Sequence, residues 1–225
     1  MGTFLILVSG IAWTIVYVEA SRVGFRDRTY AMPIAALGLN IAWEWTYAVR
    51  SLSAGTSIQG VIDLVWGLGD VLIAYTFFRY GRAEFPSFIS RKVFAGWGAL
   101  VFALSFATQW LFIAEFGGKD AAVYSAFLQN LLMSGLFIAM FVGRRGLRGQ
   151  SLTIATAKWL GTLAPTILFG VLEHRPFVLG IGLMCSVLDL VYIGLCAWAK
   201  RNGAALAQPP KQHAGASDAE PIPAS

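Results

Sequence analysis

A carboxylate interrupts the apolar segment LNIAWEWTYAV, which spans residues 39–49. On a helix, Asn40, Trp43, Glu44 and Tyr47 fall at positions i, i+3, i+4 and i+7, so an amide, an indole, a carboxyl and a phenol share one face. An unpaired ionised carboxylate is costly in hydrocarbon, which makes Glu44 a candidate for chemistry. The alternative is a structural hydrogen bond between helices.

Two further apolar segments also carry acids. Residues 61–78 place four acidic and aromatic side chains on one helical face: Asp63, Trp66, Asp70 and Phe77. Asp189 lies near the middle of the last apolar segment. No Lys or Arg is expected deep enough in the membrane to neutralise these acids, because Lys158 falls in the cytoplasmic third of the segment 152–172.

Without a basic partner, removal from water favours the neutral form of a carboxylic acid, and a second carboxyl in the same cavity favours it further. We therefore expect Glu44, Asp70 and Asp189 to converge on a chamber where an acid can donate a proton. Aromatic rings around it can stabilise a cation through their quadrupoles. The candidates for the lining are Asn40, Trp43, Tyr47, Trp66, Phe77, Trp110, Phe137 and Tyr192.

Seven apolar segments, each long enough to cross a hydrocarbon core of roughly 30 Å, must position these side chains. Of the 225 residues, 57% are hydrophobic and only 13% are charged, as is typical of a membrane protein. The segments are residues 3–18, 30–49, 61–78, 93–114, 122–142, 152–172 and 177–199. We predict an all-α polytopic membrane protein, with a catalytic bundle of seven transmembrane helices over residues 1–199. Residues 200–225, rich in Ala, Pro, Gly and Ser, are predicted to form a disordered cytoplasmic tail.

Basic residues are distributed unevenly between the loops. The loops after the first, third and fifth segments and the tail contain most of them, whereas only Arg50, Lys119 and Arg175 lie on the other side. The positive-inside rule therefore predicts an N-terminus outside and a C-terminus in the cytoplasm. The net charge of +5 then reflects topology and contacts with lipid headgroups, so no nucleic-acid partner is expected, and nothing indicates an obligatory protein partner.

The motif NIAWE at residues 40–44, followed by Tyr47, and the acid in LDLVY at residues 188–192 carry a resemblance. Together with the chain length and the seven spans, they resemble the integral membrane terpene cyclases of fungal meroterpenoid and indole-diterpenoid pathways and their bacterial relatives. The resemblance covers residues 1–199. It implies that Glu44 and Asp189 start cyclisation and that Asp70 is a supporting polar residue.

The implied reaction is protonation of the terminal epoxide or terminal alkene of a prenyl chain, followed by a carbocation cascade. The implied substrate joins this chain to a polar head such as an indole, a diketopiperazine, a pyrone or a phenol, and it partitions into the bilayer among membrane lipids. No cofactor is expected, since the chain lacks the DDxxD and DxDD motifs of soluble terpene cyclases. No metal site is expected either, because the only two histidines, His174 and His213, lie outside the spans.

Two other classes of membrane protein are compatible with parts of this pattern. A microbial rhodopsin requires a lysine deep in its last helix, and residues 177–199 contain none. A small proton-coupled transporter that relays protons through Glu44, Asp70 and Asp189 remains the alternative. Its acids should form a path between the two membrane faces, whereas these acids lie in the central and outer parts of the spans. The sequence therefore favours the enzyme.

Overall fold

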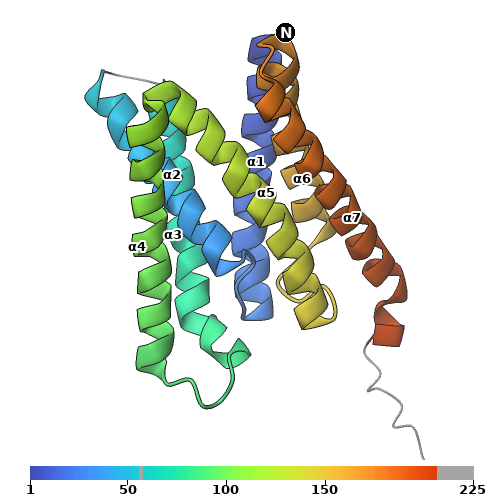
Figure 1. The fold of residues 1–225 in the computed structure, drawn as a ribbon. Coiled ribbons are helices and arrows are strands. Elements are labelled where there is room, and N and C mark those ends of the chain that lie inside the picture. The colour runs from blue at the N-terminus through green and yellow to red at the C-terminus, as the bar shows by residue number, and fades with distance from the viewer. Residues whose placement is uncertain (56–57, 207–225) are drawn as a thin grey trace, which may run out of the picture.

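The computed structural model describes residues 1–55 and 58–206, and it shows a bundle of seven long helices (Figure 1). They are α1 (Gly2–Asp27), α2 (Ile34–Ser53), α3 (Ile58–Tyr80), α4 (Arg91–Phe116), α5 (Gly118–Arg144), α6 (Leu152–Pro165) and α7 (Pro176–Leu206). A short 3-10 helix, η1 (Gly81–Glu84), follows α3, and a π-helix, η2 (Thr166–Leu172), follows α6. The predicted all-α fold is confirmed.

The helix ends differ from the predicted segments in two informative places. α2 begins at Ile34 rather than at residue 30, because Pro33 has no amide hydrogen and occupies the N-cap. α7 continues to Leu206 rather than ending at residue 199. The rest of the predicted tail, residues 207–225, lies outside the described residues.

Within the described residues, six helices are long and apolar enough to cross a membrane. α2 is the exception, since Asn40, Glu44 and Arg50 lower its hydropathy. It packs against α3, α4 and α5, so Asn40 and Glu44 are covered by protein rather than lipid, whereas Arg50 near its end is exposed. Close approach to α4 depends on Gly38, where a Cβ atom would lie 2.8 Å from Ser105 Oγ.

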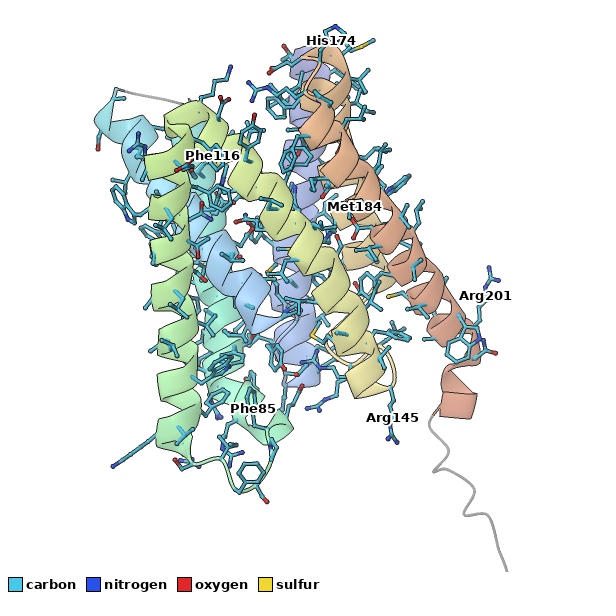
Figure 2. All side chains as sticks on the ribbon, in the orientation of Figure 1. Phe85, Phe116, Arg145, His174, Met184 and Arg201 are labelled. Atoms are coloured by element: carbon cyan, nitrogen blue, oxygen red, sulfur yellow. The ribbon has the colours of Figure 1, made fainter. Side chains whose placement is uncertain are left out.

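The other helices surround this arrangement. α1 packs against α3 and α6, and α7 packs against α5 and α6. Apolar side chains also cover the outer surface, as at Met184 on α7, which is half exposed (Figure 2). Such a surface suits lipid contact.

The two ends of the bundle differ in charge. The loops that follow α1, η1 and α5 lie at one end, together with Arg145 and Arg201, and we call this the basic end (Figures 1 and 2). The N-terminus and His174 lie at the opposite end, which we call the N-terminal end (Figure 2). The assignment of the basic end to the cytoplasm stays a prediction.

Candidate active site

A cavity of about 380 Å³ lies between α1, α2, α5, α6 and η2, with Trp66 contributed by α3. This volume is within the range of small-molecule sites. Its apolar wall combines small and aliphatic side chains with five aromatic ones: Trp13, Trp43, Trp66, Phe127 and Phe169. Its polar wall gathers eight side chains: Ser9, Tyr17, Asn40, Glu44, Lys119, Gln129, Asn130 and Thr162. The cavity therefore combines an acid with an aromatic surround, as the sequence predicts for Glu44.

Glu44 belongs to a buried hydrogen-bond network that joins three helices. The Tyr17 hydroxyl donates to Glu44 Oε1 at 3.1 Å, and Asn40 Nδ2 donates to the Tyr17 oxygen at 2.6 Å. The same amide nitrogen donates to Asp70 Oδ2 at 2.8 Å. Glu44 Oε2 and Asp70 Oδ1 have no hydrogen-bond partner among the described residues. The two carboxyl groups are thus linked through Asn40 and Tyr17, and each keeps one unpartnered oxygen.

The orientation of the Asn40 amide is fixed from the opposite side of the cavity. Gln129 Nε2 donates to Asn40 Oδ1 at 3.4 Å, and Gln109 Nε2 donates to Gln129 Oε1 at 3.2 Å. Because the oxygen of Asn40 accepts from Gln129, its nitrogen faces Tyr17 and Asp70. α4 and α5 therefore help to hold the acid network on α2.

Neither Glu44 nor Asp70 forms an ion pair in the part of the chain that the structure describes. Glu44 is almost fully buried, and Asp70 is fully buried. In general, a carboxyl group that is removed from water without a nearby cation favours its protonated form. The two acids lie in one network, but only Glu44 lines the cavity, so the predicted convergence on the chamber is wrong for Asp70.

Asp189 lies in a different environment. Its two carboxylate oxygens accept hydrogen bonds from Lys158 Nζ at 2.8 and 3.0 Å, and the two side chains are only 1% and 0% exposed. Lys158 Nζ also donates to Ser134 Oγ at 2.7 Å. The prediction that no basic residue reaches the deep acids is therefore wrong for Asp189. Lys158 lies about two turns inside α6, and its long side chain extends to α7.

The ion pair is connected to the cavity wall, although Asp189 itself does not line the cavity. Ser134 donates to the Asn130 carbonyl at 2.9 Å, and Thr162 donates to the Lys158 carbonyl at 3.1 Å. Asn130 and Thr162 both line the cavity. The Lys158–Asp189 pair therefore supports the wall from behind, where α5, α6 and α7 meet.

Two indoles in the wall are anchored by their nitrogens. Trp66 Nε1 donates to Thr14 Oγ1 at 3.2 Å, and its ring stacks on Tyr17 with centroids 6.0 Å apart. Trp43 Nε1 donates to the Ala122 carbonyl at 3.0 Å. These hydrogen bonds hold two aromatic rings beside the chamber that contains Glu44, where their π-systems can interact with positive charge.

α6 shapes the opposite wall through its backbone. Pro165 has no amide hydrogen to give to the Gly161 carbonyl, and the Ser9 hydroxyl of α1 donates to that carbonyl at 2.8 Å instead. Gly161 also allows close approach of α1, since a Cβ atom there would lie 2.9 Å from the Trp13 indole. After Pro165 the chain continues as η2, which contributes Phe169 to the wall.

Four of the predicted lining residues lie elsewhere. Phe77 is packed in an aromatic cluster, with its ring centroid 4.8 Å from that of Phe94. Trp110 is 59% exposed on the outer surface of α4. Phe137 and Tyr192 pack against each other in the core, with centroids 5.3 Å apart. Aromatic side chains suit a core, a lipid-facing surface and a cavity alike, so their presence on a span does not determine which of these they occupy.

Of the remaining predicted residues, only some lie in the cavity wall, and Asp70 lies behind it. Asn40, Trp43, Glu44 and Trp66 line the cavity, and Tyr47 lines a pocket beside it. The sequence-based prediction missed the contribution of α1, which is Ser9, Trp13 and Tyr17. These three residues are spaced at i, i+4 and i+8, and this periodicity on an apolar helix could have identified the face of α1 that meets the acid.

Comparison with known proteins agrees with this geometry. The family model of Pyr4-like transmembrane terpene cyclases matches residues 1–202. The terpene cyclase pyr4 of Aspergillus fumigatus is 29% identical over 200 residues, which cover 84% of this chain and 82% of that protein. The Pyr4-family terpene cyclase mfmH of Annulohypoxylon moriforme is 27% identical over 167 residues, which cover 73% of this chain and 68% of that protein.

A third relative, asnovolin H synthase nvfL of Aspergillus novofumigatus, is 27% identical over 163 residues, which cover 70% of this chain and 65% of that protein. No solved structure gives a significant match. The family match extends over all seven helices and includes the cavity, and it favours an enzyme over the transporter alternative. We conclude that the chain is a multi-pass integral membrane enzyme of secondary metabolism that acts on a terpenoid, and that it belongs to the Pyr4-like transmembrane terpene cyclases.

Proposed function

We propose that this cyclase protonates the terminal epoxide or terminal alkene of a prenylated substrate and closes its rings through a carbocation cascade. One observation supports this most directly. Glu44 lies in the wall of an aromatic-lined cavity, keeps one oxygen without a hydrogen-bond partner, and has no ion-pair partner among the described residues. An acid in such a place can hold a proton and deliver it to an apolar substrate.

The reaction then balances without a further reagent. Glu44 gives its proton to the epoxide oxygen, whose bond to the tertiary carbon breaks, or to the terminal alkene, whose π electrons form the new C–H bond. The positive charge on carbon is attacked by the next double bond of the chain, and ring closure repeats. Loss of a proton from carbon to the Glu44 carboxylate forms the final alkene and restores the acid. The overall reaction is an isomerisation.

Tyr17, Asn40 and Asp70 are proposed to position the acid. Because the Tyr17 hydroxyl donates to Oε1, the transferable proton belongs on Oε2 of Glu44. The same hydroxyl stabilises the carboxylate that remains after proton transfer. Asp70 does not line the cavity, and its hydrogen bond from Asn40 holds the amide that donates to Tyr17. Asp70 therefore acts through Asn40 and Tyr17.

Asp189 is proposed to act as a supporting residue rather than as the proton donor. The resemblance to the family implies that this acid takes part in initiation. In this chain, however, the carboxylate is paired with Lys158, and it reaches the cavity only through neighbours on α5 and α6. Both oxygens of Asp189 bind Lys158 and the residue does not line the cavity, so it is not placed to contact a substrate.

The proposed activity is tested with membranes from cells that express the chain. Farnesylated and geranylgeranylated indoles and phenols are supplied, each as the terminal epoxide and as the alkene, and products are identified by mass spectrometry and NMR. We expect a cyclised isomer of at least one substrate, absent from membranes without the chain. Cyclisation of prenyl diphosphates with release of diphosphate, and of none of these compounds, would contradict the proposal.

The aromatic wall makes a separate prediction. Trp66→Leu removes a ring beside the chamber while the acid remains, so substrate consumption should persist. Partly cyclised and prematurely deprotonated products should increase, because each ring stabilises a passing cation by roughly 0.5–2 kcal/mol. The measurement is the product ratio per amount of folded protein. Trp110→Leu, which alters an exposed indole, serves as the control. An unchanged ratio for Trp66→Leu would assign that ring to packing alone.

A further inference from the structure

A second pocket of about 380 Å³ adjoins the catalytic cavity. Both are lined by Trp43, Lys119 and Ala122. The Trp43 indole, which is hydrogen-bonded to the Ala122 carbonyl, therefore forms a partition between the two spaces. We call the second space the adjoining pocket, and its polar lining includes Tyr47, Arg50, Asp63 and Lys119.

The adjoining pocket is rich in hydrogen-bond donors. Arg50 and Lys119 are exposed and form no ion pair within the described parts of the chain. The Tyr47 side chain is only 6% exposed, and its hydroxyl has no hydrogen-bond partner there. The Ser125 hydroxyl lies beside that of Tyr47 and donates to the Ala122 carbonyl. The Tyr47 hydroxyl therefore still has the capacity for a further hydrogen bond.

The charges in the pocket favour an acidic ligand. Asp63 is the one carboxyl in the lining; it is buried and already takes part in an interaction. The two basic side chains in the lining, Arg50 and Lys119, therefore outnumber its single acidic side chain. A phenol- or enol-type oxygen could accept hydrogen bonds from Arg50, Lys119 and Tyr47, and these bonds strengthen as the oxygen gains negative charge.

We propose that the adjoining pocket binds the polar head of the substrate and selects heads that present an acidic phenol- or enol-type oxygen. This inference rests on the proposed function, because the prenyl chain then occupies the catalytic cavity. Tyr47 is three residues from Glu44 on α2, a rise of about 4.5 Å. A substrate with its head beside Tyr47 and its far end at Glu44 must fold its chain back on itself. Ring closure requires such a folded chain.

The test compares an epoxidised farnesylated phenol with its methyl ether, which has the same chain but no acidic oxygen. In the active enzyme, we expect the KM for the phenol to be about tenfold lower. Arg50→Met should raise the KM for the phenol to near that for the ether, with kcat within about twofold of the parent value. Lys119→Met alters a side chain that also lines the catalytic cavity, so its expected effect is a smaller ratio between the two KM values. Turnover of the ether by each variant reports on folding. Lys92→Met and Arg91→Met, exposed at the basic end, are the matched controls.

Binding of the same two compounds to Glu44→Gln protein in nanodiscs separates this inference from the proposed function. If the parent enzyme converts neither compound but Glu44→Gln protein still binds the phenol more tightly, the proposed reaction fails and the head-group pocket stands. If both compounds bind and react equally well, or if Lys119→Met and Arg50→Met keep the preference for the phenol, the pocket assignment is overturned. If neither compound binds to the Glu44→Gln protein, the pocket assignment is overturned as well.

Discussion

Glu44→Gln is expected to accumulate in membranes like the parent protein while cyclised product falls by at least about 100-fold. The amide has nearly the same shape and can still accept a hydrogen bond from Tyr17 through its oxygen. It has no proton of suitable acidity, so the epoxide or alkene stays unreacted. Product formation is measured by mass spectrometry in membranes that contain equal amounts of folded protein.

The matched control for this change is Glu115→Gln, since Glu115 is an exposed carboxyl near the end of α4. That variant should keep the parental rate, which shows that loss of a carboxylate as such is harmless. Turnover by Glu44→Gln within about tenfold of the parent enzyme would assign the initiating proton to another group.

Lys158→Met should produce the largest loss of folded protein. The change leaves the Asp189 carboxylate buried without its cation, and breaking a buried ion pair in this way typically costs about 3–5 kcal/mol. Replacing both partners removes the unpaired charge, so the double variant Lys158→Met/Asp189→Leu should recover much of the yield. Folded protein is measured by fluorescence-detected size exclusion after extraction from membranes. Arg175→Met breaks partly exposed pairs with Asp120 and Glu173 and should change the yield much less than Lys158→Met.

The double variant also decides what Asp189 does. If this acid supports the cavity wall, the folded double variant should retain cyclase activity, because Glu44 and its network are intact. If the double variant folds at the parental level but forms no product, Asp189 takes part in the chemistry itself. That outcome would contradict its assignment as a supporting residue.

The sequence predicts the acid face of α2 well because of a strong physical constraint. Polar side chains on an otherwise apolar span must face protein, and a helix fixes which residues share a face. The spacing of Asn40, Trp43 and Glu44 is therefore enough to place them together. Trp66 is placed by the same argument on α3. Helical periodicity carries this information within each span.

The rotation of each helix about its axis and the contacts between different helices are much harder to predict from sequence. Lys158 and Asp189 lie on different helices, and only the packing of α6 against α7 brings them together. Tyr17 is on a span without a buried acid of its own, so no charge indicated that its hydroxyl meets Glu44. Trp110, like Trp66, is a tryptophan within an apolar helix, but its side chain faces outward. Such contacts depend on how helices turn relative to one another, which periodicity within a span does not specify.

The division of the cavity between helices has an evolutionary consequence. α1, α2 and α3 provide the acid and its hydrogen bonds, whereas α5, α6 and η2 form the facing surface, partly through the backbone at Gly161 and Pro165. Apart from Gln129 of α5, which holds the Asn40 amide, residues of the second group can change and remould the space in which a prenyl chain folds without disturbing the first. New ring skeletons can therefore arise by drift on one half of the bundle while the other half preserves the initiating step. Ancestral reconstruction should find more sequence change in α5, α6 and η2 than in α1, α2 and α3.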